Sequence, residues 1–338
     1  MKTKYDTNIK RHSLKRLKND LEFCLIIGVY LIFSILILGI SSLEIWLLDL
    51  LSHFRIQFVI ISGIGLIVFV FKRKRIPFTV SLGNIIINTL IVLPYFAATT
   101  LNKVNHEVKS EKVRFMISNI FSSNIHFDEA IELFIKTKPD FLVILELNEI
   151  WNKKLDALKD SFPYEIRLPR NDNFGIALFS KYPLEDAQIS PLLDGMTPAV
   201  ITKSNVNGHQ INILGVHTLP PISSSYFNKR NQQLRLLGEH ASKSEIPLVL
   251  LGDLNTTMWT SSFIKFLKIS NLKDTRLAQG INPTWPTQLY FLQIPIDQIL
   301  VSSEWEVLNL HSVNLAGSDH QSLVLDANLT DQNSRVRK

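Results

Sequence analysis

Two kinds of hydrophobic pattern divide the chain near residue 110. Before that point apolar residues form long uninterrupted runs, whereas after it they form runs of four to six residues separated by polar turns. The long runs indicate membrane-spanning helices, because about 20 apolar residues cross the ~30 Å hydrocarbon core of a bilayer. The short runs predict the strands of a folded domain.

The sequence predicts three membrane spans, over about residues 21–40, 56–71 and 78–98. In the first run Glu22 is the only charge, and no small-residue cleavage site follows, so a removed signal peptide is not expected. The third run contains Asn84, Asn88 and Pro94, which makes it the weakest of the three. Between the first two runs, residues 41–55 mix apolar and charged positions, which predicts a short amphipathic helix at the interface.

These patterns predict five consecutive segments. They are a basic cytoplasmic N-terminus (1–20), a transmembrane region (21–100), a tether (101–112), a folded domain (113–330) and a tail (331–338).

The net charge of +6 is unevenly distributed. Residues 1–110 hold 14 Lys and Arg against 6 Asp and Glu, whereas residues 111–338 hold 22 against 24. The folded domain therefore lacks the basic surface typical of nucleic-acid binding. The basic clusters precede the first run and separate the second from the third, and such clusters favour the cytoplasmic side of a membrane.

Three spans with a cytoplasmic N-terminus would make a multi-pass protein of the cell (inner or plasma) membrane. The folded domain would then lie on the extracytoplasmic side. If the third run is not a span, that domain is cytoplasmic instead.

The folded domain alternates strands with helices. Strands are predicted over 113–118, 141–145, 175–179, 211–216, 248–251 and 299–302, and helices over 127–137, 149–159 and 227–242. This alternation favours a layered α/β or α+β domain with a large core. The single cysteine, Cys24, excludes a disulfide framework and a cysteine-based zinc site.

Polar residues gather at the ends of the predicted strands. They are Asn119, Glu146, His217, Asp253, Asn255, Asp297, Asp319 and His320. Singly, such residues are more often turn residues or helix caps, but together they predict a site. Carboxylate and amide oxygens suit Mg²⁺ or Mn²⁺ rather than zinc, and histidines add proton transfer. This combination is typical of phosphate-ester hydrolysis.

Two motifs are specific: Gly252-Asp253-Leu254-Asn255 and Gly317-Ser318-Asp319-His320, with Glu146 upstream of both. In this order they resemble the endonuclease/exonuclease/phosphatase superfamily over residues 113–330. The resemblance implies an α+β fold, a four-layered sandwich of two mixed β-sheets flanked by helices. Here it would follow an N-terminal bundle of about three transmembrane helices.

The resemblance also implies roles for the polar residues. Asn119, Glu146 and Asp319 would hold Mg²⁺ or Mn²⁺, with Glu146 as the principal ligand. Asp253 would orient or deprotonate the attacking water, and Asn255 would steady it. Asp297 would pair with His320, and His217 falls where many members have a second phosphate-binding histidine. Glu149 is a rival to Glu146, and Asn124 could also reach the site.

A narrower resemblance is to membrane-tethered bacterial members similar to teicoplanin-resistance membrane proteins. It is carried by the prolines after His217 and by Thr284-Trp285-Pro286 before Asp297. The chain departs from these relatives at Gln298, where they usually have His. That difference could alter hydrogen bonding without removing a metal ligand.

The resulting hypothesis is a membrane-anchored, divalent-metal-dependent phosphoesterase that acts on phosphate ester or pyrophosphate bonds. Its partners would be the lipid bilayer and a lipid-linked or small phosphorylated substrate; no protein partner is indicated. The alternative is a membrane-tethered endonuclease or exonuclease acting on nucleic acid. Arg167, Arg170, Lys229, Arg230 and Arg235 could form a local patch for it. A third hypothesis is an inactive scaffold, which the full set of polar residues disfavours.

Overall fold

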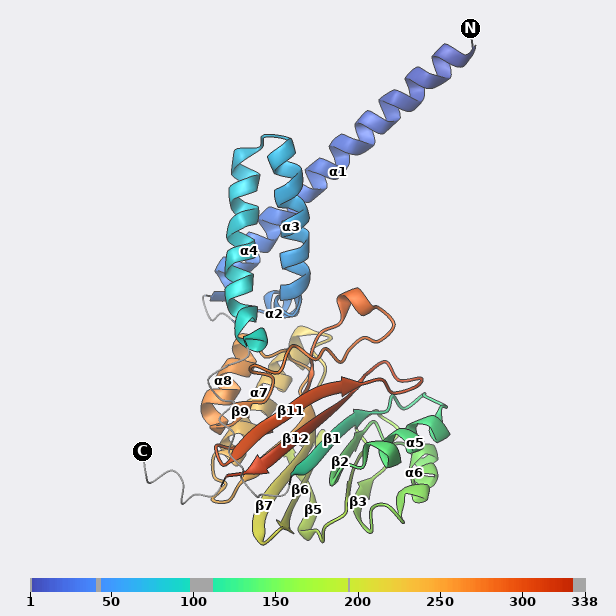
Figure 1. Cartoon of the computed structure of the whole chain (residues 1–338), viewed down its shortest axis with the longest axis vertical. Coiled ribbons are helices and arrows are strands. Elements are labelled where there is room, and N and C mark those ends of the chain that lie inside the picture. Colours follow the sequence, from blue (N-terminus) through green and yellow to red (C-terminus); the bar gives the residue numbers. More distant parts are fainter. Residues whose placement is uncertain (1, 41–43, 98–111, 194, 331–338) are drawn as a thin grey trace. The chain divides into compact units, whose positions relative to one another are not determined.

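The computed structural model describes residues 2–40, 44–97, 112–193 and 195–330 (Figure 1). Within these ranges, the side chains of residues 2–13, 34–40 and 192–193 are not described. The chain forms two compact units, Met1–Leu93 and Pro94–Lys338, which are treated separately below. The predicted tail and almost all of the predicted tether lie outside the described residues.

The N-terminal unit is helical. Its helices are α1 (Lys2–Ile40), α2 (Trp46–Ser52), α3 (Arg55–Phe71) and α4 (Arg75–Phe96), whose last residues belong to the second unit. The short helix predicted within residues 41–55 is α2. Two of the predicted spans correspond to α3 and α4.

Three predicted spans are more than the described residues support. Within the described residues, only α4 is long and apolar enough to cross a membrane alone. The 17 residues of α3 are too few, so it counts as a second candidate only together with α2, from which it is bent by 72°. The run over 21–40 stays a prediction, because the side chains of residues 34–40 are not described.

Polar residues inside α4 are buried and bonded to neighbouring elements. Asn84 donates from Nδ2 to the carbonyl oxygen of Val29 in α1 at 3.0 Å. Asn88 accepts at Oδ1 from Nη1 of Arg55 in α3 at 3.3 Å. Amides can lie within apolar helices when they bond across a helix interface. These two polar residues weakened the sequence pattern, and both face other helices of the unit.

The second unit contains two mixed six-stranded sheets. Sheet 1 has the strand order β11 (Trp305–Val313), β12 (Ser322–Leu329), β1 (Val113–Asn119), β2 (Phe141–Leu145), β4 (Ile176–Ser180) and β3 (Tyr164–Leu168). Sheet 2 has the order β5 (Glu185–Leu193), β6 (Thr197–Val206), β7 (His209–His217), β8 (Leu248–Asp253), β10 (Asp297–Val301) and β9 (Lys273–Asp274).

Each sheet has one parallel pair at its centre. Strands β1 and β2 are parallel in sheet 1, and β7 and β8 are parallel in sheet 2. A parallel pair needs a crossover connection, usually a helix. Helix α5 (Phe127–Thr137) makes the first crossover and α7 (Ser224–Ala241) the second. The remaining strands add antiparallel neighbours.

The sheets pack face to face around a common core. Phe115 and Val143 of sheet 1 and Ile213 and Val249 of sheet 2 belong to one buried cluster. On the outer face of sheet 1, α5, α6 (Glu149–Lys154) and the 3₁₀ turn η1 (Leu155–Leu158) bury a second cluster. Helices α7 and α8 (Ser261–Ser270) lie on the opposite side of the sandwich (Figure 1). The predicted two-sheet sandwich flanked by helices is confirmed.

The predicted elements cover the centre of this fold better than its edges. All six predicted strands are present, and the helix predicted over 149–159 is divided into α6 and η1. The sequence pattern missed β3, β5, β6, β9, β11, β12 and α8. Several of these lie at sheet edges, where a partly exposed face interrupts the apolar run, as in β3 and β11.

Candidate active site

The topology brings the ends of six strands to one edge of the sandwich. The parallel pairs end there at Asn119 and, one residue beyond β2, Glu146 in sheet 1, and at His217 and Asp253 in sheet 2. The carboxyl ends of parallel strands meet at the same edge of a sheet. Each crossover therefore brings two strand ends, with the polar residues found there, to one edge of its sheet.

Antiparallel neighbours place two more strand beginnings at the same edge. Strand β10 begins with Asp297, whose register partner is Asp253 at the end of β8. Strand β12 runs antiparallel to β1, so the loop before it, with Asp319 and His320, lies beside the end of β1. Residues distant in sequence therefore meet in space.

A buried ion pair joins the two sheets at this edge. His320 Nδ1 lies 2.8 Å from Oδ2 of Asp297, and both side chains are buried. Burial opposes a charge on His320, but the charge and hydrogen bond of Asp297 outweigh it and raise the pKa of His320 to about 10. Burial also opposes the charge of Asp297, yet the neighbouring His320 lowers its pKa below the usual value.

Asp253 and His217 lie beside this pair. Oδ2 of Asp253 is 3.6 Å from Nε2 of His217 and 3.9 Å from Nε2 of His320. Burial and the charge of Asp297 raise the pKa of Asp253 to about 7. Burial, with the charge on His320, lowers the pKa of His217 to about 4. At neutral pH His217 is thus a neutral imidazole, whereas His320 is charged.

Asn119 and Glu146 form the sheet 1 side of the site. Asn119 Nδ2 donates to Oε1 of Glu146 at 3.0 Å, and the backbone N–H of Ser122 donates to Oε2 at 3.1 Å. Glu146 has a φ of 64°, a left-handed conformation that costs a non-glycine residue about 1–3 kcal/mol. Such strain is common at functional sites. Burial raises the pKa of Glu146 against these hydrogen bonds.

Asp319 reaches the site from the loop before β12. Its Oδ2 accepts from Nε1 of Trp285 at 3.1 Å, and its carbonyl oxygen accepts from the N–H of Thr287. Its Oδ1 is buried and has no hydrogen-bond partner within residues 112–193 and 195–330. A buried carboxylate oxygen without a donor is costly, and a bound cation would satisfy it.

The charge of the site fits a divalent cation. Four carboxylates, those of Glu146, Asp253, Asp297 and Asp319, meet with one charged imidazole. Single ligand atoms of Asp253, Asp297 and His320 all lie within 4.8 Å of one another, close enough to hold a metal. Burial is the main reason that the pKa values of Glu146 and Asp253 are raised, and the neighbouring carboxylates raise them further. Oxygen-rich ligand sets of this kind suit Mg²⁺ or Mn²⁺.

Of the three remaining candidates, Asn255 lies at the site, whereas Asn124 and Glu149 do not. Asn255 follows Asp253 with a φ of 48°; its N–H donates to Oδ1 of Asp253, and its Nδ2 donates to the carbonyl of Thr218. Asn124 instead donates to the carbonyl of Ala316 and so braces a loop. Glu149 is exposed in the first turn of α6. Of the two rival glutamates, Glu146 is the one bonded to Asn119.

Several contacts at the site involve residues that sequence reasoning did not select. Ser318 Oγ donates to the carbonyl of Asn119 and accepts from the N–H of His320. The ring of Phe174 lies 5.2 Å from that of His217. The only sequence signal for Ser318 was its place inside the Gly-Ser-Asp-His motif.

Gln298 points away from the site residues. It is buried, and its Oε1 accepts from Nη1 of Arg276, whose Nη2 donates to the carbonyl of Asp297 at 2.6 Å. Successive side chains of a strand point to opposite faces, so the residue after Asp297 faces the other way. Gln298 therefore secures Arg276 behind Asp297, and the Asp297–His320 contact is formed with glutamine at this position.

Comparisons with known proteins agree with this geometry. A model of the Endonuclease/Exonuclease/phosphatase family matches residues 117–320. A search of curated proteins finds no match.

Solved structures resemble the second unit. D. rerio TDP2 complexed with single strand DNA product has a TM-score of 0.56 at 15% identity, covering 64% of this chain and 99% of that one. The endonuclease/exonuclease/phosphatase from Bacteroides vulgatus has a TM-score of 0.56 at 17% identity, covering 65% and 99%. The human Nocturnin catalytic domain with bound sulfate anion has a TM-score of 0.53 at 19% identity, covering 65% and 94%. At these identities the likeness shows the fold alone.

Removing the carboxylate of Asp297 should lower the pKa of His320 so far that its imidazole is neutral at pH 7. In Asp297→Asn the burial of His320 is no longer offset by the adjacent charge, so its pKa should fall from about 10 to below about 6.5. Because the folded-state pKa is raised, protonated His320 contributes stability that is complete below about pH 6.5 and lost as pH rises through about 10. Histidine NMR titration of chelator-treated protein measures this pKa.

Asp186→Asn, at an exposed position, is the control and should leave the His320 titration unchanged. If His320 stayed protonated at pH 8 in Asp297→Asn, the other carboxylates would be sufficient to hold its charge. That result would contradict the dominant role of Asp297.

Proposed function

Because the chain belongs to the endonuclease/exonuclease/phosphatase family, whose members are metal-dependent phosphoesterases, we propose that it hydrolyses phosphate ester or pyrophosphate bonds of a lipid-linked substrate while anchored in a membrane. The observation that carries the proposal is the cluster of buried carboxylates and histidines at one edge of the sandwich. The apolar helix α4 supports the membrane anchor.

Glu146, Asn119 and Asp319 would hold the divalent metal ion, Mg²⁺ or Mn²⁺. The arguments are the orphaned Oδ1 of Asp319 and the raised pKa of Glu146. Asp297 and His320 are engaged with each other through the 2.8 Å contact of Oδ2, which makes them poorer ligands, although Oδ1 of Asp297 is also buried without a hydrogen-bond partner among the described residues. When bound, the ion would neutralise charge on the phosphoryl oxygens.

Asp253 would orient and deprotonate the attacking water. A general base is most effective when its pKa lies near the working pH, and the pKa of Asp253 is raised to about 7. Asn255 lies on the same turn, and its amide is fixed by the bond to the carbonyl of Thr218. One N–H of that amide is left to steady the water or a phosphoryl oxygen.

The two histidines would take different roles. Charged His320, held in orientation by Asp297, presents Nε2 as a donor to a phosphoryl oxygen that gains charge. His217 remains neutral at pH 7 because its pKa is about 4, so it contributes a hydrogen bond and no charge. Of the two histidines, only His320 would supply electrostatic stabilisation.

Exposed apolar side chains on the segment that follows Trp285 favour a lipid-linked substrate. Trp285 and Thr287 contact Asp319, and the segment that follows them carries Tyr290 and Phe291, which are 82% and 70% exposed. Large apolar side chains exposed together often mark a binding surface. Here they would contact the hydrocarbon part of a substrate whose phosphate lies at the metal.

The proposed topology is multi-pass, with the catalytic domain on the extracytoplasmic side of the cell membrane. It is supported by the basic clusters that flank the apolar runs, since cytoplasmic loops carry an excess of Lys and Arg. The net charge of −2 over residues 111–338 favours a lipid substrate over nucleic acid.

Turnover should depend on metal and on Asp253. Full-length protein in detergent, given Mg²⁺ or Mn²⁺, should release phosphate from undecaprenyl pyrophosphate. Asp253→Asn should lower the rate at least about 100-fold, because it removes the base. The exposed Asp186→Asn should stay within about twofold of wild type.

A parallel reaction with supercoiled plasmid tests the alternative function. Metal-dependent nicking of the plasmid without phosphate release would favour a nuclease and contradict the lipid proposal. Unchanged turnover in Asp253→Asn would contradict the assigned base. No activity on either substrate would overturn the substrate class.

The exposed aromatics should affect only a substrate with a hydrocarbon chain. Tyr290→Ser with Phe291→Ser should raise KM for undecaprenyl pyrophosphate about tenfold or more, because burying each ring contributes roughly 1.5–3 kcal/mol. The rate on bis(p-nitrophenyl) phosphate, which has no such chain, should not change. Leu308→Ser, an exposed apolar position in β11, is the matched control. Equal losses on both substrates would contradict a hydrocarbon-binding role.

A further inference from the structure

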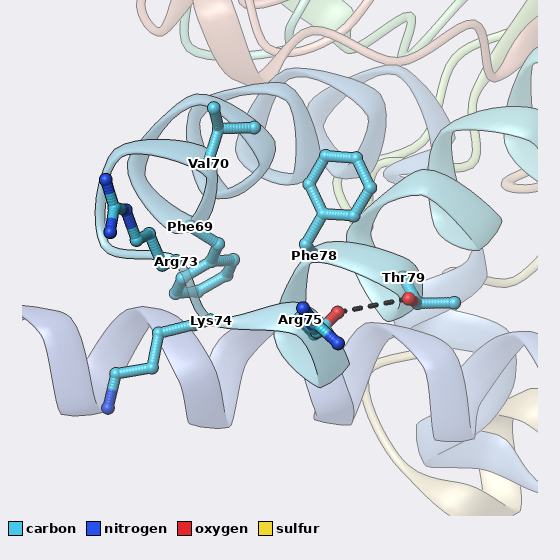
Figure 2. Close-up of a pocket in the computed structure, with 7 residues that line it drawn as sticks. All are labelled: Phe69, Val70, Arg73, Lys74, Arg75, Phe78 and Thr79. Atoms are coloured by element: carbon cyan, nitrogen blue, oxygen red, sulfur yellow. Dashed lines mark hydrogen bonds between the residues drawn. The ribbon is translucent and has the colours of Figure 1, made fainter.

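The turn between α3 and α4 carries a cavity that the catalytic site does not use. Its volume is about 390 Å³, within the roughly 300–1,000 Å³ range of ligand pockets. Phe69 and Phe78 line it together with Arg73, Lys74 and Arg75. Figure 2 shows the ring of Phe69 beside Arg73 and the ring of Phe78 on the side of the pocket where Arg75 lies.

The charge of this cavity is positive and only partly compensated. Its lining includes three cationic side chains and no carboxylate. Glu22 of α1 pairs with Lys72 at 2.8 Å and with Lys74 at 3.8 Å. Among the described residues, Arg73 and Arg75 form no ion pair. Two guanidinium groups are therefore available to an anion from outside the chain.

The backbone of the turn is one in which glycine would be the more favourable residue. The N–H of Arg73 bonds to the carbonyl of Val70, and the N–H of Lys74 bonds to that of Phe69. This pair of bonds is the Schellman ending of a helix, whose left-handed position is usually glycine. Arg73 occupies that position with a φ of 52°. Arginine therefore carries a conformational cost at this position that glycine would not.

The surroundings of the cavity identify the anion as part of a lipid. Phe71, 83% exposed, and Ile76, also exposed, flank the basic residues on either side. Apolar and basic side chains placed together are typical of a protein segment at a membrane surface. Guanidinium groups bind phosphate through paired hydrogen bonds, and the N-terminus of the 22-residue helix α4 adds favourable dipole charge.

We propose that this cavity binds the headgroup of an anionic phospholipid. Arg73 and Arg75 would contact its phosphate, and Phe69 and Phe78 would contact the glycerol and the first methylenes of its chains. The proposal concerns the N-terminal unit alone and does not depend on the substrate of the catalytic site.

The test measures lipid affinity without any activity. Full-length protein in detergent is titrated with phosphatidylglycerol or phosphatidylcholine, and lipid-bound species are quantified by native mass spectrometry. Wild type should prefer phosphatidylglycerol. Arg73→Gly with Arg75→Gln should weaken its binding about 25-fold, since one basic residue near an anionic lipid surface is worth about fivefold. Phosphatidylcholine binding should not change.

The variants separate binding from folding. Arg73→Gly supplies the residue that the turn favours, so its melting temperature should not fall below that of wild type. Arg75 does not occupy the left-handed position of the turn. The single variant Arg75→Gln should weaken phosphatidylglycerol binding about fivefold. Arg16→Gln with Lys18→Gln removes the same charge from exposed positions of α1 and should change affinity by less than twofold.

Two results would overturn the proposal. One is an equal loss of affinity in the α1 control, which would show a general charge effect. The other is equally tight binding of soluble glycerophosphoglycerol, which would show a site for free phosphate esters without a lipid. Either result would leave the proposed hydrolase activity untouched.

Discussion

The contact between Asp297 and His320 joins the two sheets at the edge where the site lies. Asp297 begins a strand of sheet 2, and His320 leads into a strand of sheet 1. Their 2.8 Å ion pair is buried, so it gains from the low dielectric that would make either charge alone costly. Ser318 adds a second tie by bonding both Asn119 and the N–H of His320. The relative position of the sheets thus sets the geometry of the site.

The site also carries an excess of negative charge. His320 compensates Asp297, but Glu146, Asp253 and Asp319 remain within the same small region. The raised pKa values of Glu146 and Asp253 express the cost of charging them there. A divalent cation would remove that cost, and it would also satisfy the orphaned oxygen of Asp319. The protein accepts an unfavourable charge arrangement, together with backbone strain at Glu146 and Asn255, at the place where metal and phosphate would meet.

The central strands could be predicted from the sequence because they are buried on both faces. Strands β2 and β8 are completely buried, which produces uninterrupted apolar runs. The edge strand β11 is buried only at Trp305 and Leu310, and β3 has no buried residue, so neither forms such a run. The third apolar run was the weakest in the sequence, yet α4 is the helix best suited to span a membrane. Its asparagines face other helices, and an unaligned sequence does not show which way a side chain points.

The site residues were predictable in part for the same reason. Residues that directly follow a buried strand, such as Asn119, Glu146 and Asp253, are marked by the end of an apolar run. Arg276 has no such mark, because its contact with the carbonyl of Asp297 exists only in the folded chain. Trp285 was marked by its motif, but its contact with Asp319 was not. The place of Gln298 behind Asp297 could be inferred only once its strand register was known.

The position of the metal tests the account most directly. Mn²⁺ binding to chelator-treated protein can be measured by electron paramagnetic resonance for wild type, Glu146→Gln and Asp297→Asn. If Glu146 is the principal ligand, Glu146→Gln should weaken binding at least about 10-fold to 100-fold, and Asp297→Asn should weaken it less. Loss of Mn²⁺ in Asp297→Asn with full binding in Glu146→Gln would place the ion among Asp253, Asp297 and His320, and would contradict the account.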